Sequence, residues 1–180
     1  MQGDPTNTAP IAAGSSSQAM NTLRIVAGAM IAGSALFLVV AAATRGQQLL
    51  ADDPWNIMEP LTLVGLVIAV AVPYAIFAAA NRLAFAAAEG LRKEAKGAKP
   101  DPAWPGWPPL SPMLYRAYQT ATILEFAGLE GPAFFNGIAY MVEGSAISAI
   151  VAAALIGVMT WKFPVEDRVR GWMEGALSPS

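Results

Sequence analysis

The chain contains neither cysteine nor histidine, and charged residues are scarce. Without cysteine it can form no disulfide and carries no thiol nucleophile. Without either residue it lacks Cys/His zinc sites, histidine haem ligation and histidine acid–base catalysis. Only 13% of the residues are charged, whereas a soluble domain carries about 25%. The net charge of −2 provides no basic footprint for nucleic acid.

Long apolar runs take up much of the remaining sequence, which is 55% hydrophobic. A helix needs about 20 apolar residues to cross the hydrocarbon core of a bilayer. Three of these runs are free of charge, and another, 121–142, contains two acids, Glu125 and Glu130, among many apolar side chains. We therefore predict an all-α integral membrane protein with four transmembrane helices, arranged as two tandem hairpins of the same orientation. The four runs are 25–44, 61–80, 121–142 and 144–161.

Basic residues give the predicted spans an orientation. Four spans would place ten of the eleven lysines and arginines on one side, with Arg45 alone on the other. Cytoplasmic loops carry such an excess of basic residues. We therefore expect a multi-pass protein of the cell inner (cytoplasmic) membrane with both termini in the cytoplasm. The ten residues are Arg24, Arg82, Arg92, Lys93, Lys96, Lys99, Arg116, Lys162, Arg168 and Arg170.

Composition divides the chain into five segments. Residues 1–22 are polar and predict a disordered cytoplasmic tail without the basic start of a signal peptide. The first hairpin, with a cytosolic extension of its second helix, is expected at 23–96, and the second at 112–163. A loop rich in proline and tryptophan joins them at 97–111, and an amphipathic tail follows at 164–180.

Two of these segments allow two interpretations each. The 97–111 loop is typical of a stiff connector that rests Trp104 and Trp107 on the membrane interface, or of a proline-rich docking ligand. In the tail, Val165, Val169 and Trp172 recur at helical spacing. That spacing predicts an amphipathic helix lying on the membrane surface, with partner binding as the alternative.

The first and third runs align at an offset of 98 residues and share the pattern A-x-x-x-G-x-A-x-F. Each copy carries a pair of small residues four positions apart, Ala29 with Gly33 and Ala127 with Gly131. Such pairs let membrane helices approach closely. We expect the first and third helices to pack side by side, with Arg24 near Glu125 and Arg45 near Glu143.

The two acids of the third run differ in depth. Glu125 lies near the cytoplasmic edge and shares a stripe with Asn136, whereas Glu130 lies about 13 Å in from that edge. Desolvation there favours the neutral acid, which needs a hydrogen-bond partner. By depth, Ser34 and Tyr74 are the expected partners. Glu130 is the functional candidate, and a purely structural, hydrogen-bonded glutamate is the alternative.

The segment from Leu129 through Glu130, Gly131 and Pro132 to Ala139 resembles the ion-binding helix of the rotary ATP synthase proteolipid, subunit c. The resemblance implies that Glu130 binds a proton or sodium ion. The chain departs from that family in its second helix, which lacks the glycine-rich repeat, and in its long cytoplasmic loop. As a whole, it looks like the small four-helix membrane proteins of bacteria.

The sequence thus leaves two functions open. The chain offers no nucleophile–base set, glycine-rich phosphate loop or metal cluster. We therefore expect no cofactor and a structural or accessory membrane role without catalysis. The alternative is a protein that handles protons or cations through Glu130. Its expected partners are the lipid bilayer and either further copies of the chain or another membrane protein.

Overall fold

The computed structural model describes residues 15–46, 55, 58–95, 99 and 101–178. These residues form five α-helices and no strand, which confirms the all-α prediction for this part of the chain. Most of the predicted 1–22 tail lies outside the described residues. The helices are α1 (Ser16–Arg45), α2 (Pro60–Ala95), α3 (Ser111–Glu143), α4 (Ala146–Trp161) and α5 (Glu166–Leu177).

Two of these helices are long and apolar enough to cross a membrane, namely α1 and the Pro60–Arg92 part of α2. Together, α4 and α5 satisfy the same criteria as a pair, but they are bent by 72° at the break between them. On its own α4 has only 16 residues. The 33-residue α3 is long enough, and it carries Glu125 and Glu130 in the middle of its apolar sequence.

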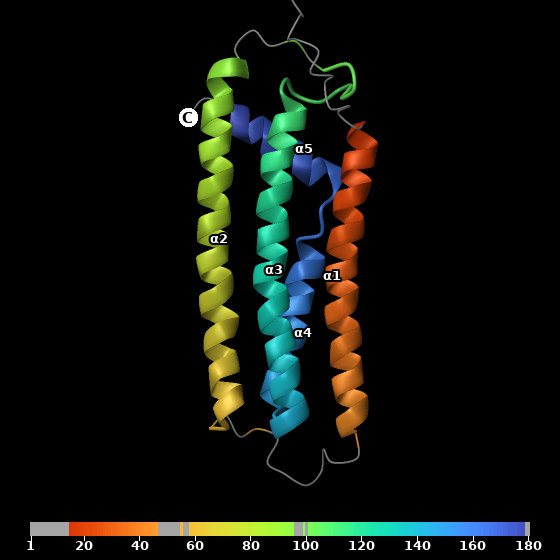
Figure 1. Ribbon diagram of the computed structural model, residues 1–180, viewed down its shortest axis with the longest axis vertical. Coiled ribbons are helices and arrows are strands. Elements are labelled where there is room, and N and C mark those ends of the chain that lie inside the picture. The colour runs from red at the N-terminus through yellow and green to blue at the C-terminus, as the bar shows by residue number, and fades with distance from the viewer. Residues whose placement is uncertain (1–14, 47–54, 56–57, 96–98, 100, 179–180) are drawn as a thin grey trace, which may run out of the picture.

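The helices form a bundle with α3 at its centre (Figure 1). α1 and α3 run in one direction, α2 and α4 run back, and α5 lies across one end. α3 packs against α1, α2 and α4, and it separates α1 from α2. The side-by-side packing of the first and third helices is therefore confirmed. The first two helices, however, do not pack directly against each other as a hairpin.

Glycines on α3 explain its central position. A methyl group at Gly128 would lie 3.0 Å from the side chain of Ile76 on α2. One at Gly137 would lie 2.7 Å from the ring of Phe37 on α1. The absence of side chains at these two positions lets both neighbouring helices approach closely.

The small-residue pairs singled out in the sequence do not serve this purpose within the chain. Ala29, Gly33, Ala127 and Gly131 are all exposed. A methyl group at Gly33 or Gly131 would meet no atom within 4 Å. The prediction was wrong about which glycines bring the helices together, since these four residues face outward.

One end of the bundle, which we call the basic end, holds the starts of α1 and α3, the end of α2, and α5, whereas α4 ends about halfway along the bundle (Figure 1). Here the connecting loop and α5 join the helices in a buried group that we call the end cluster. The end cluster comprises Met20, Leu23, Ala88, Trp104, Trp107, Leu114, Tyr115, Val169, Met173 and Ala176.

The end cluster corrects two expectations. Trp104 and Trp107 do not rest on a membrane interface, because they are only 2% and 7% exposed and pack edge to face in protein. Residues 16–22 are helical rather than disordered. The hydroxyl of Tyr115 donates a hydrogen bond to the carbonyl of Ala19, 2.6 Å away, and Met20 is buried. These contacts extend α1 beyond the apolar run.

α5 lies within the predicted amphipathic tail, and its apolar face is directed at the bundle. Val169 and Met173 are fully buried, whereas Val165, just before the helix, is exposed. Nε of Arg92 on α2 donates to the carbonyl of Ala176, 2.7 Å away, near the carboxyl end of α5. α5 therefore closes the basic end of the bundle, and its contact with lipid stays a prediction.

Candidate functional site

Glu130 lies at the edge of α3 that faces α1, beside the outer surface. It is partly exposed, and Ala127, one turn before it, is exposed. Phe134, one turn after it, packs on Phe37 of α1 with ring centroids 4.9 Å apart. Side chains three and four residues apart share a face of a helix. Glu130 therefore lies on the side of α3 next to α1, at a partly exposed position.

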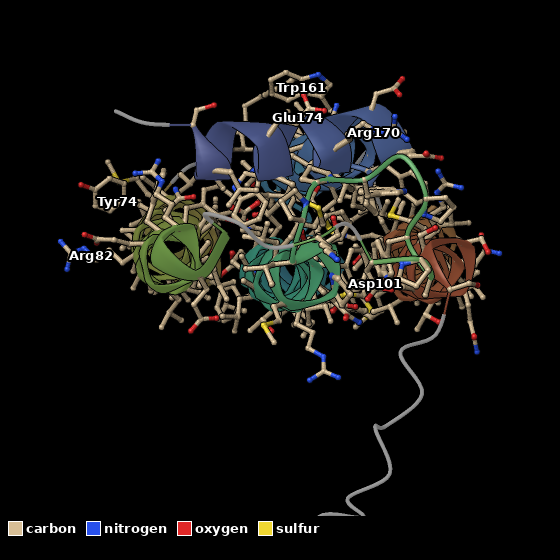
Figure 2. All side chains as sticks on the ribbon, turned by 90° about the horizontal axis from the view of Figure 1, so that it is seen from above. Tyr74, Arg82, Asp101, Trp161, Arg170 and Glu174 are labelled. Atoms are coloured by element: carbon tan, nitrogen blue, oxygen red, sulfur yellow. The ribbon has the colours of Figure 1, made fainter. Side chains whose placement is uncertain are left out.

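The partners expected for Glu130 lie elsewhere. Tyr74 is 77% exposed and points away from the bundle at the outer side of α2 (Figure 2). Ser34 is buried, and its hydroxyl has no hydrogen-bond partner among the described residues. Within the described part of the chain, no hydrogen bond or ion pair involves the carboxyl group of Glu130. The structure does not bring the predicted polar set together.

Glu125 has a different partner from the one expected. Nζ of Lys162, just after α4, lies 2.6 Å from its Oε2. The same ammonium group lies 4.3 Å from the centre of the Phe77 ring on α2. Arg24 instead donates from Nε to the carbonyl of Pro164, 3.3 Å away. The predicted Arg24–Glu125 pair is therefore wrong, and α4 rather than α1 supplies the cation.

Asn136 joins α3 to α2 and is completely buried. Its Nδ2 donates to the carbonyl of Gly65, 3.1 Å away, and to that of Pro132, 2.9 Å away. A methyl group at Gly65 would lie 2.6 Å from Oδ1 of Asn136. Polar side chains of membrane helices often bond across the helix interface in this way. Asn136 thus contacts α2 and does not form a site with Glu130.

Charged groups at the opposite end of the bundle bind helix termini, which the sequence analysis missed. Glu143 accepts hydrogen bonds from the backbone N–H groups of Leu61 and Thr62, at 2.6 and 2.8 Å. It also accepts one from the Thr62 hydroxyl at 2.8 Å. Its negative charge therefore caps the amino end of α2, where the helix dipole favours an anion.

Arg45 does the reverse at the carboxyl end of α3. Its Nη1 donates to the carbonyls of Tyr140 and Met141, at 3.3 and 3.1 Å. Gly144, which ends the helix with a φ of +78°, leaves room for the guanidinium group. Arg45 and Glu143 lie at the same end of the bundle, as the repeat predicted. The hydrogen bonds above, however, join each of them to the terminus of a helix. Both charged residues directly follow an apolar run in the sequence, and this position is the signal that could have predicted their capping role.

The geometry thus separates the polar residues into two kinds. Glu125, Asn136, Arg45 and Glu143 bond to neighbouring parts of the bundle, whereas Glu130 is partly exposed and bonds to none of the described residues. Among the described residues, no group of three or more acidic side chains could hold a metal ion. The chain matches no protein-family model, no curated protein and no solved structure.

Proposed function

We propose that the chain is a four-span protein of the cytoplasmic membrane with a structural or accessory role. Exposed apolar side chains on the outward faces of α3 and α4 support the two additional spans. Exposed apolar surface on this scale is unusual for a protein in water. The exposed apolar residues include Ile25, Leu36 and Val39 of α1, Val64, Val67 and Val70 of α2, Leu124, Ile138 and Val142 of α3, and Ile150 of α4.

The distribution of charge supports cytoplasmic termini. The bundle gathers the basic residues of the described chain at the basic end, apart from Arg45 at the other. The positive-inside rule then assigns the basic end to the cytoplasm. In this orientation, the end cluster forms a folded cap on the cytoplasmic face of the membrane.

One observation carries the structural role. The polar groups within the bundle are used to hold helices together, as in the Lys162–Glu125 ion pair and the Asn136–Gly65 hydrogen bond. Buried polar groups with bonded partners fix the arrangement of helices. A protein built in this way supplies a rigid membrane bundle with a cytoplasmic cap. On this proposal, its partners are the lipid bilayer and other membrane proteins.

Glu130 supports a second candidate function, the handling of protons or cations. Its carboxyl group has no partner among the described residues and borders the outer surface rather than the interior. An acid at such a depth is costly unless it is protonated or meets a cation. In a homo-oligomer, the partly exposed side of α3 that carries Glu130 would lie between copies, where an ion could reach its carboxyl group.

Flux measurements on reconstituted protein separate the two functions. Liposomes containing the wild type, Glu130→Gln or Glu125→Gln would be tested for proton and sodium flux, and the oligomeric mass would be measured in detergent. For a structural protein we expect flux equal to that of empty liposomes in all three samples. Flux by the wild type that disappears in Glu130→Gln but persists in Glu125→Gln would overturn the structural role in favour of ion handling.

A further inference from the structure

A pocket opens at the basic end where α2, α3, α4 and α5 meet, and none of the functions above uses it. Its volume is about 290 Å³, close to the lower limit for small-molecule sites, about 300 Å³. Aromatic side chains and charged or hydrogen-bonding groups share its wall. The lining residues are Asn81, Ala84, Tyr118, Ala121, Thr122, Glu125, Trp161, Lys162, Arg168 and Trp172.

The charges of this wall favour an anion. Two cations, Lys162 and Arg168, face one carboxylate, Glu125, so the lining has a formal charge of +1. Nη1 of Arg168 is fixed by the carbonyls of Trp161 and Phe163, at 2.9 and 3.0 Å. Its Nε and Nη2 make no hydrogen bond with the described residues. A guanidinium group held in this way presents its remaining donors to a ligand.

Neutral donors accompany the cations. Tyr118 packs against Trp172, with ring centroids 5.4 Å apart. Burial raises the pKa of Tyr118, so its hydroxyl stays protonated near neutral pH. Asn81 and Thr122 add an amide and a second hydroxyl to the wall. The pocket therefore combines a net positive charge with several hydrogen-bond donors, a combination that suits phosphate oxygens.

The surroundings of the pocket suit a lipid. Trp161 at its rim is 76% exposed and projects outward from the bundle (Figure 2). Tryptophan is enriched where membrane meets water. From Trp161, an exposed strip runs along α4 through Gly157 and Ala154 to Ile150. These residues recur every three or four positions, so they form a continuous apolar path away from the pocket.

We propose that this pocket binds the phosphodiester headgroup of an anionic phospholipid, with an acyl chain along the exposed strip of α4. A phosphodiester carries one negative charge, which matches the formal charge of the lining. Arg168 and Lys162 contact the phosphate, and Tyr118 and Asn81 bond to its oxygens or to the headgroup hydroxyls. The lipid, rather than free phosphate, follows from the apolar strip and from the proposed membrane location.

The proposal is tested by native mass spectrometry of the intact protein in detergent, titrated with phosphatidylglycerol or phosphatidylcholine. We expect phosphatidylglycerol to bind more tightly than phosphatidylcholine. Arg168→Gln should weaken phosphatidylglycerol binding about fivefold, as expected for the loss of one charge contact. Arg82→Gln is the matched control, because Arg82 lies at a similar depth but points away from the bundle (Figure 2). It should change binding less than twofold.

Glu125→Gln is a second variant, and it is expected to strengthen lipid binding rather than weaken it. Removing this carboxylate frees Lys162 and raises the charge of the lining, so phosphatidylglycerol should bind more tightly. Because misfolding would destroy the pocket, a gain that is specific to phosphatidylglycerol, in a variant whose unfolding remains cooperative, keeps the test decisive if Arg168→Gln fails to fold. Equal binding of the two lipids, equal effects of Arg168→Gln and Arg82→Gln, or no gain with Glu125→Gln would overturn the proposal. Displacement of the lipid by equimolar inorganic phosphate would assign the pocket to free phosphate instead.

Discussion

Gly65 and Asn136 form a polar contact between α2 and α3 that depends on a missing side chain. In Gly65→Ala, the added methyl group would lie 2.6 Å from Oδ1 and 3.1 Å from Cγ of Asn136. Because Asn136 is completely buried, it has little room to move, and its hydrogen bond to Gly65 would be lost. We expect destabilisation by about 1–3 kcal/mol, measured as a lower unfolding midpoint in detergent.

Gly33→Ala is the matched control for that substitution. Gly33 also lies within a helix, but a methyl group there would meet no atom within 4 Å. Because alanine has a higher helix propensity than glycine, the unfolding midpoint should stay the same or rise. Equal losses in the two variants would contradict the close approach of α2 and α3 at Gly65.

Tyr115 makes the stability of the basic end depend on pH. Burial, followed by the nearby Tyr118, raises the pKa of Tyr115 to about 12 from an ordinary value of 10.0. The folded protein thus favours the neutral phenol, whose stabilising effect is complete below pH 10 and is lost as the pH rises towards 12. Over that range, we expect the free energy of unfolding to fall by about 2 kcal/mol.

An absorbance titration of tyrosinate, with unfolding midpoints between pH 9 and 12, measures this effect. Tyr115→Phe should remove the component that titrates at the highest pH, and it should reduce the loss of stability at alkaline pH. If the tyrosinate component lost in Tyr115→Phe titrates near pH 10 instead, Tyr115 is not buried.

Among the elements, α5 is the one whose position depends most on packing rather than on its own sequence. Met173 of α5 is fully buried in the end cluster. Met173→Ala should cost about 2–4 kcal/mol through lost burial and the cavity left behind. Because Trp104 and Trp107 belong to the same cluster, acrylamide should also quench tryptophan fluorescence more strongly in this variant. Val165→Ala, at an exposed position, should change neither property.

Helix positions could be predicted from local sequence, because they depend on uncharged runs and on breaks such as Pro60 and Pro112. The partners of each helix could not be predicted in this way. Gly33, which is exposed, and Gly128, which packs on Ile76, occur in similar apolar sequence. Only the central position of α3 distinguishes them. A small-residue pattern therefore indicates a close approach without showing which helix approaches, or whether any does.

Of the candidate site, only Glu130 itself could be predicted from the sequence, and its partners could not. The depth of Glu130 follows from counting residues along α3, and the structure leaves the side chain partly exposed at the outside of the bundle. Its expected partner Tyr74 was chosen by depth alone, and depth does not fix the direction in which a helix presents a side chain. The prediction that Trp104 and Trp107 rest on the membrane interface was wrong for a related reason. Tryptophan near a predicted membrane boundary suits the interface, but here the loop and α5 bury it in protein.

Across the whole molecule, charged side chains at both ends of the bundle bind helix termini. Glu143 binds the amino end of α2, and Arg45, Arg168 and Arg92 bind the carboxyl ends of α3, α4 and α5. Each charge has the sign that the helix dipole favours. These contacts satisfy backbone groups that helices leave unpaired. They also let charged groups occupy the ends of an otherwise apolar bundle.

The proposed four-span arrangement makes a prediction about the two ends of the molecule, and the absence of native cysteine makes it easy to test. Gly46 and Val142 are exposed near the end opposite the basic end, whereas Lys99 and Ser178 are exposed near the basic end. With four spans, single cysteines at Gly46 and Val142 should react with an impermeant thiol reagent in intact cells. Cysteines at Lys99 and Ser178 should react only after the membrane is permeabilised.

Thiol labelling of Val142→Cys distinguishes four spans from two. If only α1 and α2 crossed the membrane, α3 would stay on the same side as Lys99, and Val142→Cys would be protected along with Lys99→Cys. If α3 crosses, as its exposed Leu124, Ile138 and Val142 suggest, Val142→Cys should be labelled together with Gly46→Cys. Labelling of Lys99→Cys with protection of Gly46→Cys would instead reverse the orientation. In that case the basic end, its end cluster and the pocket beside Arg168 would all face away from the cytoplasm.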